Sequence, residues 1–478
     1  MHTDTDPIKD AVIIGAGISG LALAFRLKQA GLETLVLEKT AQAGGVMQTE
    51  QADGFLIDCG PNSTLDTSPK IRQFLSDVGL TDSRLDANAC ANRRYILRGG
   101  KLQALPMNPL QFMKSGLFST RAKFRLLAEP FISPAPADKE ETISEFVERR
   151  LGREFLDYAI NPFIAGVYAG DPDRLSVRSA VAKIYTLEKK YGSLIKGAIK
   201  GARERKKRAE VDKTRAGLFS FKNGMSELPT TLSVHLKQNI LVQTELEQIT
   251  PPVSKDGLYI LRINQDGKVS TVQTNALIFA TPAFVTAGYL SEIDVNLSAQ
   301  LHDINYPPVA MVFLGYKNNY RCRPLDGFGF LVPKVEQRNI LGVIWSSTLF
   351  PQRAPEGGIA VTTFVGGMRQ PQLTEKRDED LIELVRHDLK DLLQLQGEPA
   401  VVKIKKWPRA IPQYELGHQK KIAAIEKCES ERPGLFITGN FRGGISVGDC
   451  IVQSEIMADK VLKFFKTKPA FVESKVNA

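Results

Sequence analysis

The chain has 478 residues, a formal net charge of +10 and 43% hydrophobic residues. A chain of this length and composition can fill the cores of two or three globular domains, which argues against a disordered or fibrous protein. Its five cysteines include no C-x-x-C pair and its five histidines do not cluster with them, so neither a metal site nor a disulfide framework is indicated.

The first motif is a nucleotide-binding unit over residues 11–38, AVIIGAGISGLALAFRLKQAGLETLVLE. It predicts a strand, a glycine turn, an amphipathic helix and a second strand that ends on an acid. The turn at 15–20 fits G-x-G-x-x-G, in which the glycines allow a tight turn, close approach of a pyrophosphate and packing of helix on strand. Glu38 lies 18 residues beyond Gly20, where a carboxylate can accept hydrogen bonds from an adenosine ribose.

The segments that follow favour FAD over NAD as the dinucleotide. A second glycine pair, Gly44-Gly45, lies just beyond the acid, and GFLIDCGPNS then places a turn at Gly60-Pro61. Much later, NALIFATPA (275–283) and PGLFITGNFRGGISVGDCI (433–451) continue this layout. The last segment reads as a strand, a glycine turn and a helix start, which suits presentation of backbone N–H groups to a flavin. FAD is therefore expected to bind both ends of the chain.

The middle of the chain is expected to be largely helical near residues 106–210. Residues 102–132 carry many large apolar side chains between a few cations, which suits either a buried helical cap or a surface that dips into lipid headgroups. After a proline-rich connector at 132–142, residues 143–170 read as two helices broken at Asn161-Pro162 and at Gly170. Residues 189–215 are strongly basic and suit an anionic surface, or simply form a solvated helix and link. Nucleic acid is not favoured as a partner, because aromatic residues are not interleaved with these cations.

Strand character resumes with LYILRI, VAMVFLGY, FGFLVP, LGVIWSS and IAVTTFVGG, whose β-branched residues and alternation predict a mostly antiparallel sheet. The longest uncharged run, Ser270 to Ser291, contains a proline and several amides and threonines, so we interpret it as a buried strand and loop and expect no transmembrane helix. The polar, acidic N-terminus is unlike a secretory signal, which predicts a reducing compartment.

Several segments resemble motifs of one family, the oxygen-dependent protoporphyrinogen oxidases of the wider flavin amine oxidase-like superfamily. The resemblance covers nearly the whole chain, and its narrower motifs are AGVYAGDPDRLSVRSAV (165–181), LEKKYGSLIKG (187–197), GFGFLVP (327–333) and LGVIWSSTLFPQRAP (341–355). It implies a mixed α/β fold: a Rossmann-like FAD-binding domain assembled from discontinuous segments, a substrate domain of the hydroxybenzoate-hydroxylase type and a helical, membrane-associating insertion.

The division of the chain implied by this resemblance is as follows. The FAD-binding domain takes 1–90, 224–290 and 401–465; the substrate domain takes 91–105, 211–223 and 291–400; the helical insertion takes 106–210; and 466–478 form a C-terminal tail.

The implied activity is oxidation of protoporphyrinogen IX to protoporphyrin IX in three flavin cycles, each reoxidised by dioxygen to give hydrogen peroxide, within heme biosynthesis. FAD carries the hydride transfer, so no side chain is assigned as catalytic and no metal is expected. The protein should supply an apolar slot and a cation for a propionate. By its match to the family motif, Arg94 in NRRYIL is the expected propionate ligand, with Arg93 as the competing alignment, and Leu331, Ile344 and Phe364 are expected to sandwich the macrocycle.

The resemblance also implies a set of FAD contacts. The residues expected to contact the pyrophosphate, the ribose, the adenine or the flavin ring system are Gly15, Ala16, Gly17, Ile18, Ser19, Gly20, Glu38, Lys39, Gly44, Gly45, Val46, Gly60, Pro61, Asn62, Ser63, Leu246, Trp407, Ile445, Ser446 and Val447. The family usually carries valine at the position of Leu246, so that contact is expected to be made by backbone.

Other activities remain as alternatives. Coproporphyrinogen III, with four propionates rather than two, stays open because of four nearby cations, Arg93, Arg94, Arg98 and Lys101. A flavin amine oxidase should carry a pair of aromatic residues around its amine, and the turn at 439–449 offers only Phe441. A polyene desaturase would also use FAD and a membrane surface. A non-enzymatic flavin-bearing binding module predicts no turnover, and a pyridine-nucleotide reductase is disfavoured because no second G-x-G-x-x-G follows a strand.

The expected partners are a tetrapyrrole, dioxygen and a membrane surface contacted through the helical insertion. We expect a cytoplasmic protein associated peripherally with the cytoplasmic membrane, and a homodimer is left open.

Overall fold

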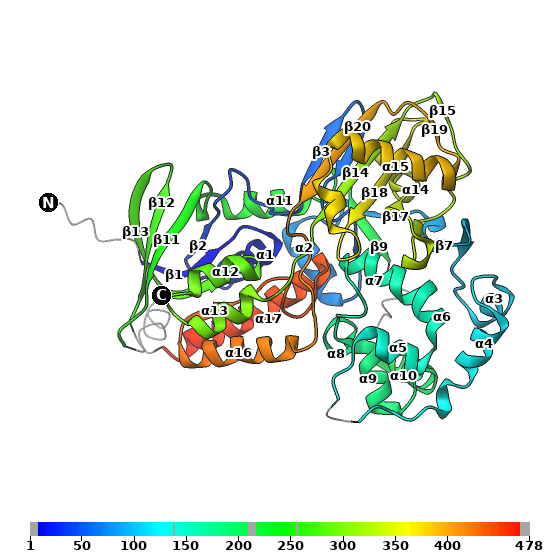
Figure 1. The fold of residues 1–478 in the computed structure, drawn as a ribbon. Coiled ribbons are helices and arrows are strands. Elements are labelled where there is room, and N and C mark those ends of the chain that lie inside the picture. The colour runs from blue at the N-terminus through cyan, green and yellow to red at the C-terminus, as the bar shows by residue number, and fades with distance from the viewer. Residues whose placement is uncertain (1–7, 137–138, 209–216, 255–256, 469–478) are drawn as a thin grey trace.

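The computed structural model describes residues 8–136, 139–208, 217–254 and 257–468 (Figure 1). Residues 1–7, part of the basic run 189–215 and most of the predicted C-terminal tail 466–478 lie outside the described residues.

The helices of the described chain have the following bounds. They are α1 Ile18–Gln29, α2 Pro69–Val78, η1 Ala89–Asn92, α3 Pro109–Lys114, α4 Thr120–Leu127, η2 Glu129–Phe131, α5 Ile143–Arg150, α6 Arg153–Phe155, η3 Leu156–Ile160, α7 Asn161–Tyr168, α8 Val177–Ala180, α9 Ala182–Tyr191, α10 Leu194–Arg208, α11 Glu227–Leu236, η4 Lys237–Asn239, α12 Ala283–Leu290, α13 Val295–His302, η5 Lys334–Glu336, α14 Ser346–Leu349, η6 Pro351–Arg353, η7 Pro371–Glu375, α15 Asp378–Leu393, α16 His418–Glu431 and α17 Val447–Lys466.

The strands are β1 Ile8–Ile14, β2 Thr34–Leu37, β3 Thr49–Ala52, β4 Phe55–Asp58, β5 Thr64–Leu65, β6 Arg84–Asp86, β7 Arg94–Arg98, β8 Lys101–Ala104, β9 Leu218–Phe221, β10 Ile240–Leu241, β11 Thr244–Thr250, β12 Tyr259–Gln265, β13 Lys268–Phe279, β14 Val309–Tyr316, β15 Tyr320–Arg321, β16 Gly329–Leu331, β17 Ile340–Ile344, β18 Ile359–Gly366, β19 Gln396–Gly397, β20 Val401–Trp407 and β21 Leu435–Ile437.

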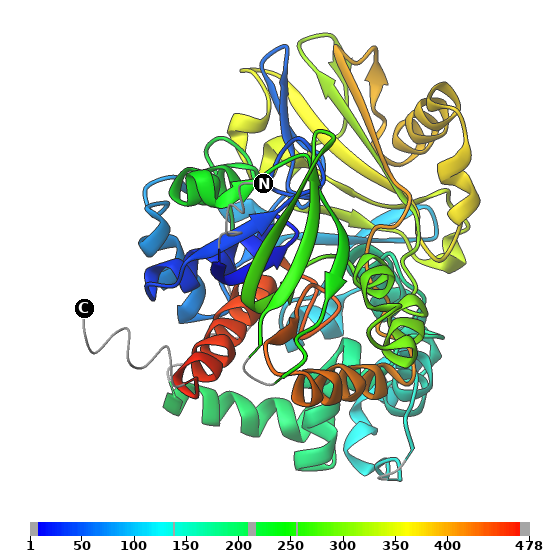
Figure 2. The same cartoon turned by 90° about the vertical axis from the view of Figure 1, so that its left-hand side faces the viewer.

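One large sheet is assembled from segments that lie far apart in the sequence. Its order is β10-β2-β1-β13-β12-β11, and β21 pairs with β13 as well. The strands β10, β2, β1, β13 and β21 run parallel to their neighbours, whereas β11, β12 and the first part of β13 form an antiparallel ribbon, which stands in front in the view of Figure 2. The sheet is therefore complete only when β1 has joined strands from the middle and the end of the chain.

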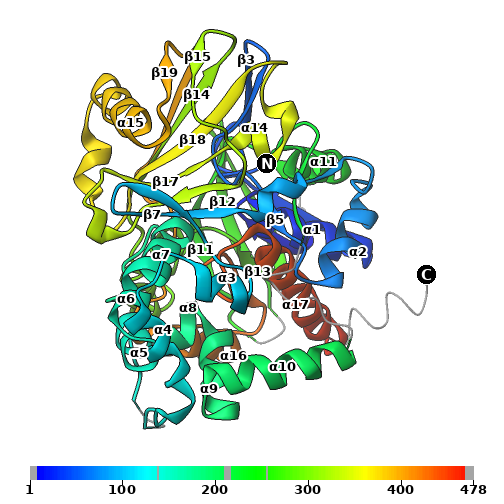
Figure 3. The same cartoon turned by 90° about the vertical axis from the view of Figure 1, so that its right-hand side faces the viewer.

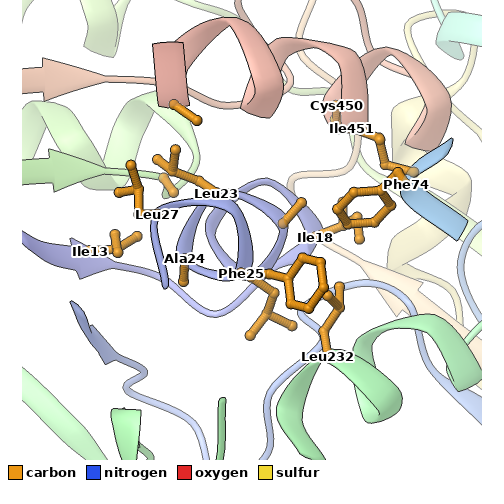
Figure 4. Packing of buried hydrophobic residues seen from close by; sticks show 14 of the residues in the cluster. Ile13, Ile18, Leu23, Ala24, Phe25, Leu27, Phe74, Leu232, Cys450 and Ile451 are labelled. Carbon is orange, nitrogen blue, oxygen red and sulfur yellow. The ribbon is translucent and has the colours of Figure 1, made fainter. Parts of the chain in front are cut away.

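Helices cover both faces of this sheet. Neighbouring residues of β1 point to opposite faces, so they pack in two different cores. Ala11 and Ile13 pack in one core with α1, α2, α11 and α17, whereas Val12 and Ile14 pack in a second core with α12, α13 and α16. Figure 4 shows the first of these cores, in which α17 lies across α1. This double covering is the Rossmann-like arrangement that the sequence predicted.

The second large sheet has the order β20-β14-β18-β17-β16-β7-β8 and is antiparallel except between β16 and β7. One of its faces packs against α15, as the shared core of Val312, Leu314, Val385 and Leu389 shows. The expected mixed α/β class, with a mostly antiparallel second sheet, is confirmed.

The helices α3 to α10 gather beside the other face of the second sheet, below β7 and β17 in Figure 3. The predicted helix break at Asn161-Pro162 is wrong. The chain turns instead at Gly152, whose φ is +91, and residues 153–168 continue as α6, a π-helical turn and α7. Pro162 follows the π-helical turn directly, so the hydrogen-bond register changes there while the helix continues past the proline. The other predicted break, Gly170, lies just beyond the end of α7 at Tyr168.

The interpretation of Ser270 to Ser291 as strand and loop is correct for β13 but wrong for its end, where residues 283–290 form α12. Among the described residues, no helix combines the length and the apolar character that crossing a membrane requires.

Candidate functional site

The glycine turn between β1 and α1 has the geometry of a phosphate-binding loop. Gly15 has a φ of +102, and a Cβ on Gly20 would lie 2.0 Å from the Gly15 carbonyl oxygen, so both positions require glycine. Gly17 is the N-cap of α1. Within the described part of the chain, no side chain caps this helix end and a Cβ on Gly17 would have no protein atom within 4 Å. The turn, with Ala16, Ile18 and Ser19 between its glycines, therefore leaves space at an uncapped helix N-terminus, where an anion is stabilised.

Glu38 lies beside this turn at the end of β2. Its Oε2 accepts a hydrogen bond from Ala16 N–H at 2.9 Å, and its Oε1 accepts one from Thr40 N–H at 2.9 Å. The next residue, Lys39, forms an ion pair with Glu245 at 2.6 Å, which brings β11 to this end of the sheet. Leu246 is 3% exposed and packs in the core, so its side chain is directed away from solvent.

The second glycine pair packs directly on the first turn. Gly44 N–H donates to the Ala16 carbonyl oxygen at 2.8 Å, and a Cβ on Gly45 would lie 3.3 Å from the Gly17 Cα. The backbone of Val46 lies against Gly60 of the next predicted segment, since a Cβ on Gly60 would lie 1.9 Å from the Val46 carbonyl oxygen.

Predicted positions near the end of the chain contact both flanks of the loop formed by Gly60, Pro61, Asn62 and Ser63. Trp407 Nε1 donates to the Cys59 carbonyl oxygen at 3.0 Å. The N-terminus of α17, at Ile445, Ser446 and Val447, meets the same loop through Gly448 N–H, which donates to Thr64 Oγ1 at 3.2 Å. These contacts bring six predicted segments together: 15–20, 38–39, 44–46, 60–63, 407 and 445–447.

These residues fit FAD. An uncapped helix N-terminus with a free space in front of Gly17 suits the pyrophosphate, and the Glu38 carboxylate beside it suits a ribose. Residues 60–63 and 445–447 would lie toward the flavin end. The bound flavin would supply the hydride acceptor that no side chain of this site offers.

The four predicted substrate residues lie on one face of the second sheet, on the neighbouring strands β7, β16, β17 and β18. Arg94 and Ile344 each pair with Gly329, and Leu331 and Phe364 each pair with Gly342. Residues that are directly opposite each other in a sheet point to the same side. Gly342 is important here because a Cβ on it would come within 2.9 Å of Leu331 Cδ2. The result is a half-buried apolar surface with a cation on β7, the outermost of these four strands.

The structure distinguishes Arg94 from its neighbour. Arg93 is paired with Asp326 at 2.7 Å and lies on the surface. Arg98, on the same face as Arg94, is paired with Glu154 at 2.7 Å. Among the described residues the Arg94 side chain has neither an ion pair nor a hydrogen-bond partner; it is exposed to solvent, and its guanidinium lies 5.3 Å from the ring centroid of Phe328. Arg94 is therefore the cation available to a ligand on this face.

Some residues around the site were not predicted from the sequence. The helix α7 covers the apolar face closely, because a Cβ on Gly166 would lie 2.5 Å from Leu331 Cδ2. Tyr414 and His418 hydrogen-bond to the backbone of 440–444, and Asp58 forms a buried ion pair with Arg353. None of these contacts leaves a local pattern in the sequence.

The fold and site define an FAD-dependent oxidoreductase. A family model for flavin containing amine oxidoreductase matches residues 18–462, and the chain belongs to that family. The protoporphyrinogen oxidase resemblance is also confirmed by relatives. Protoporphyrinogen oxidase 2 (chloroplastic/mitochondrial) of Arabidopsis thaliana is 34% identical over 96% of this chain and 95% of its own length. Coproporphyrinogen III oxidase of Bacillus subtilis (strain 168) is 30% identical over 96% of this chain and 99% of its own length.

The fold is shared with solved structures. A crystal structure of a protein from Exiguobacterium sp. 255-15 aligns with a TM-score of 0.79 and 23% identity, over 95% of this chain and 98% of that one. A putrescine oxidase structure aligns with a TM-score of 0.67 and 16% identity, over 95% of this chain and 99% of that one.

Proposed function

We propose that the protein oxidises protoporphyrinogen IX to protoporphyrin IX in heme biosynthesis, with dioxygen as electron acceptor and hydrogen peroxide as the reduced product. The observation that carries this proposal is the face formed by Arg94, Leu331, Ile344 and Phe364. A flat apolar macrocycle with a propionate at its edge matches a half-buried apolar surface that ends in an unpaired guanidinium. The relatives named protoporphyrinogen oxidase support the same substrate class.

The residues of this face bind and orient the substrate. Arg94 would hold a propionate by a charge-assisted, bidentate contact, which fixes the rotation of the macrocycle. Leu331, Ile344 and Phe364 would exclude water from its face, and α7 limits the width of the slot through the close approach of Gly166 to Leu331. Because pyrrole N–H protons can leave to solvent, the site needs no dedicated side-chain base.

Coproporphyrinogen III is the alternative substrate, and a relative bears its name. It carries four propionates, so it would favour a more cationic slot. Of the four candidate cations, Arg93 and Arg98 are already neutralised by Asp326 and Glu154. This pairing favours the substrate with two propionates.

The test is anaerobic mixing of the FAD-loaded protein with each porphyrinogen, followed by admission of air. We expect rapid bleaching of the flavin and then porphyrin fluorescence with protoporphyrinogen IX, and slower bleaching with coproporphyrinogen III. Faster reaction with coproporphyrinogen III would reverse the ranking. A flavin that stays oxidised with both would overturn the proposal and direct the search to amines and polyenes.

We also propose the division of the chain given by the resemblance, with an FAD-binding domain from 1–90, 224–290 and 401–465. Its support is the first large sheet, whose strands come from 8–37, 240–279 and 435–437. The second sheet draws its strands from 94–104, 309–366 and 401–407. Its edge strand β20 thus lies in the segment assigned to the FAD-binding domain.

We further propose that the helical insertion binds peripherally to an anionic membrane. Residues 107–131, which include α3, α4 and η2, expose the large apolar side chains of Met107, Leu110, Met113, Phe124, Leu127 and Phe131 beside the exposed cations Lys114 and Arg121. Phe131 is 88% exposed although Glu129, two positions earlier, is fully buried and pairs with Arg150. A firmly anchored segment that presents a phenylalanine to solvent suits an interfacial surface.

Co-sedimentation with phosphatidylglycerol–phosphatidylcholine vesicles tests this proposal. Replacement of Leu110, Phe124 and Phe131 by serine should abolish sedimentation. As a control, replacement of Val234 and Val295, which are also exposed but lie on α11 and α13, should leave it unchanged. Equal sedimentation of both variants would overturn the proposed surface.

A further inference from the structure

The segment 414–418, which leads into α16, contacts the glycine-rich loop 439–444 that precedes α17. Within it, Tyr414 is 3% exposed, and its hydroxyl group bridges the two ends of the loop. The hydroxyl donates to the Asn440 carbonyl oxygen at 2.6 Å and accepts a hydrogen bond from Gly444 N–H at 3.1 Å.

His418 binds the middle of the same loop. Its Nε2 lies 2.9 Å from the Phe441 carbonyl oxygen, and a carbonyl can only accept, so Nε2 carries the proton. Its Nδ1 is buried and has no hydrogen-bond partner among the described residues, and burial lowers the pKa of His418 to about 4, so the ring is neutral. The His418 and Tyr414 rings are stacked, with centroids 4.2 Å apart and an angle of 13° between their planes.

The loop itself needs such external contacts. Gly439, Gly443 and Gly444 have φ values of +144, +85 and +136, so half of its six residues are glycines in conformations that other residues rarely adopt. Glycines lose more conformational freedom on folding than other residues, and a loop rich in them keeps one shape only if its backbone groups are held from outside.

The far side of the segment is held by the helical insertion. Ser176 N–H donates to the Tyr414 carbonyl oxygen at 2.8 Å, and Leu416 N–H donates to the Arg174 carbonyl oxygen at 3.2 Å. Gly417 N–H donates to Glu140 Oε2 at 3.1 Å. The segment 414–418 therefore connects the insertion to the loop.

We propose that Tyr414 and His418 are positioning residues, which hold the loop 439–444 in the shape that receives the flavin and tie that shape to the placement of the helical insertion. The inference rests on the proposed position of the flavin beside this loop and is independent of the substrate. It assigns a role in cofactor binding to two residues whose side chains hydrogen-bond to the backbone of the loop.

The first test is titration of the apoprotein with FAD. Tyr414→Phe keeps the ring and its stacking but leaves Gly444 N–H and the Asn440 carbonyl without a buried partner, so the FAD Kd should rise on the order of tenfold. The absorbance envelope of the bound flavin should also shift. The control is Tyr168→Phe, because the Tyr168 ring meets Tyr414 at 6.0 Å while its hydroxyl bonds to the Ala180 carbonyl, outside the loop. An unchanged Kd and spectrum in Tyr414→Phe would overturn the inference.

A second pair of variants tests His418 separately. Gln can donate from its Nε2 to the Phe441 carbonyl, whereas Leu cannot, so His418→Gln should bind FAD within roughly threefold of the wild type and His418→Leu roughly tenfold more weakly. Equal binding by the Gln and Leu variants would rule out the hydrogen bond as the cause. Since both titrations use FAD alone, a wild-type protein that binds FAD but leaves both porphyrinogens unreacted would count against the proposed function only.

Discussion

Asp58 and Arg353 form an ion pair at 3.1 Å in which each side chain is only 2% exposed. Asp58 ends β4 just before the predicted flavin loop at Gly60, and Arg353 lies in η6, shortly after the substrate strand β17. The carboxylate also accepts hydrogen bonds from Thr49 Oγ1 and Met225 N–H, and the guanidinium donates to Ser220 Oγ. One buried pair therefore joins the two halves of the site.

The two members of this pair should differ in their effect on stability. Asp58→Asn leaves the Arg353 charge buried without compensation, and we expect it to lower the free energy of unfolding by about 3–5 kcal/mol. Arg353→Met should cost less, because burial already raises the pKa of Asp58 and a lone carboxyl group can take up a proton. Urea unfolding of the apoproteins measures both values. Equal losses would contradict this asymmetry.

Two glycines of the first turn should separate folding from cofactor binding. Gly20→Ala places a methyl group 2.0 Å from the Gly15 carbonyl oxygen, so it should destabilise the apoprotein. Gly17→Ala meets no protein atom within 4 Å and should change the unfolding free energy by no more than about 1 kcal/mol. Its methyl group would nevertheless stand where the pyrophosphate approaches, so FAD binding should be lost. Wild-type FAD affinity in Gly17→Ala would place the pyrophosphate elsewhere.

The neighbouring arginines of the substrate face should also differ. Arg94→Ala removes the unpaired cation and should raise the KM for protoporphyrinogen IX by roughly 10- to 100-fold, as expected for a charge-assisted contact of about 1.5–3 kcal/mol. Arg93→Ala removes only an exposed surface pair with Asp326 and should change the KM little. Steady-state porphyrin fluorescence gives both KM values. A larger effect at Arg93 would restore the competing alignment.

His418 should make stability depend on pH. Its folded pKa of about 4 lies below the ordinary value of 6.5, so the unfolded chain binds more protons between these two pH values. The contribution is complete above pH 6.5 and is lost as the pH falls toward 4, by about 3 kcal/mol in total. Because carboxyl groups titrate in the same window, the measured quantity is the difference in unfolding free energy between wild type and His418→Gln at each pH. A difference that stays constant from pH 7 to pH 4 would contradict the neutral, buried imidazole.

The sequence predicted those features that depend on neighbouring residues. The turn at 15–20, the strand before it and Glu38 after it are read from local spacing, and the structure places them as one unit. The resemblance supplied Arg94, Leu331, Ile344 and Phe364, and the pairing of β7, β16, β17 and β18 explains how residues from two distant parts of the chain share one face.

Features that depend on tertiary packing were not predictable. Proline commonly ends helices, which predicts a break at Asn161-Pro162, but the π-helical turn directly before α7 lets the helix continue past Pro162. Tyr414 and His418 lie far along the chain from the helical insertion that holds their segment, so no periodic pattern marks them. The Asp58–Arg353 pair spans nearly three hundred residues, and nothing near either residue indicates its partner.

The assembly of the first sheet has a consequence for biosynthesis. Its strand β13 pairs with both β1 and β21, and α17 covers α1, so the earliest and latest described segments share one core (Figure 4). During translation the glycine turn emerges first, but the side of α1 that packs on α17 stays uncovered until the ribosome has made α17. Contacts of such long sequence separation form slowly, because the intervening chain must be ordered first. Cofactor capture should therefore follow synthesis, and a nascent chain stalled before residue 447 should retain no FAD.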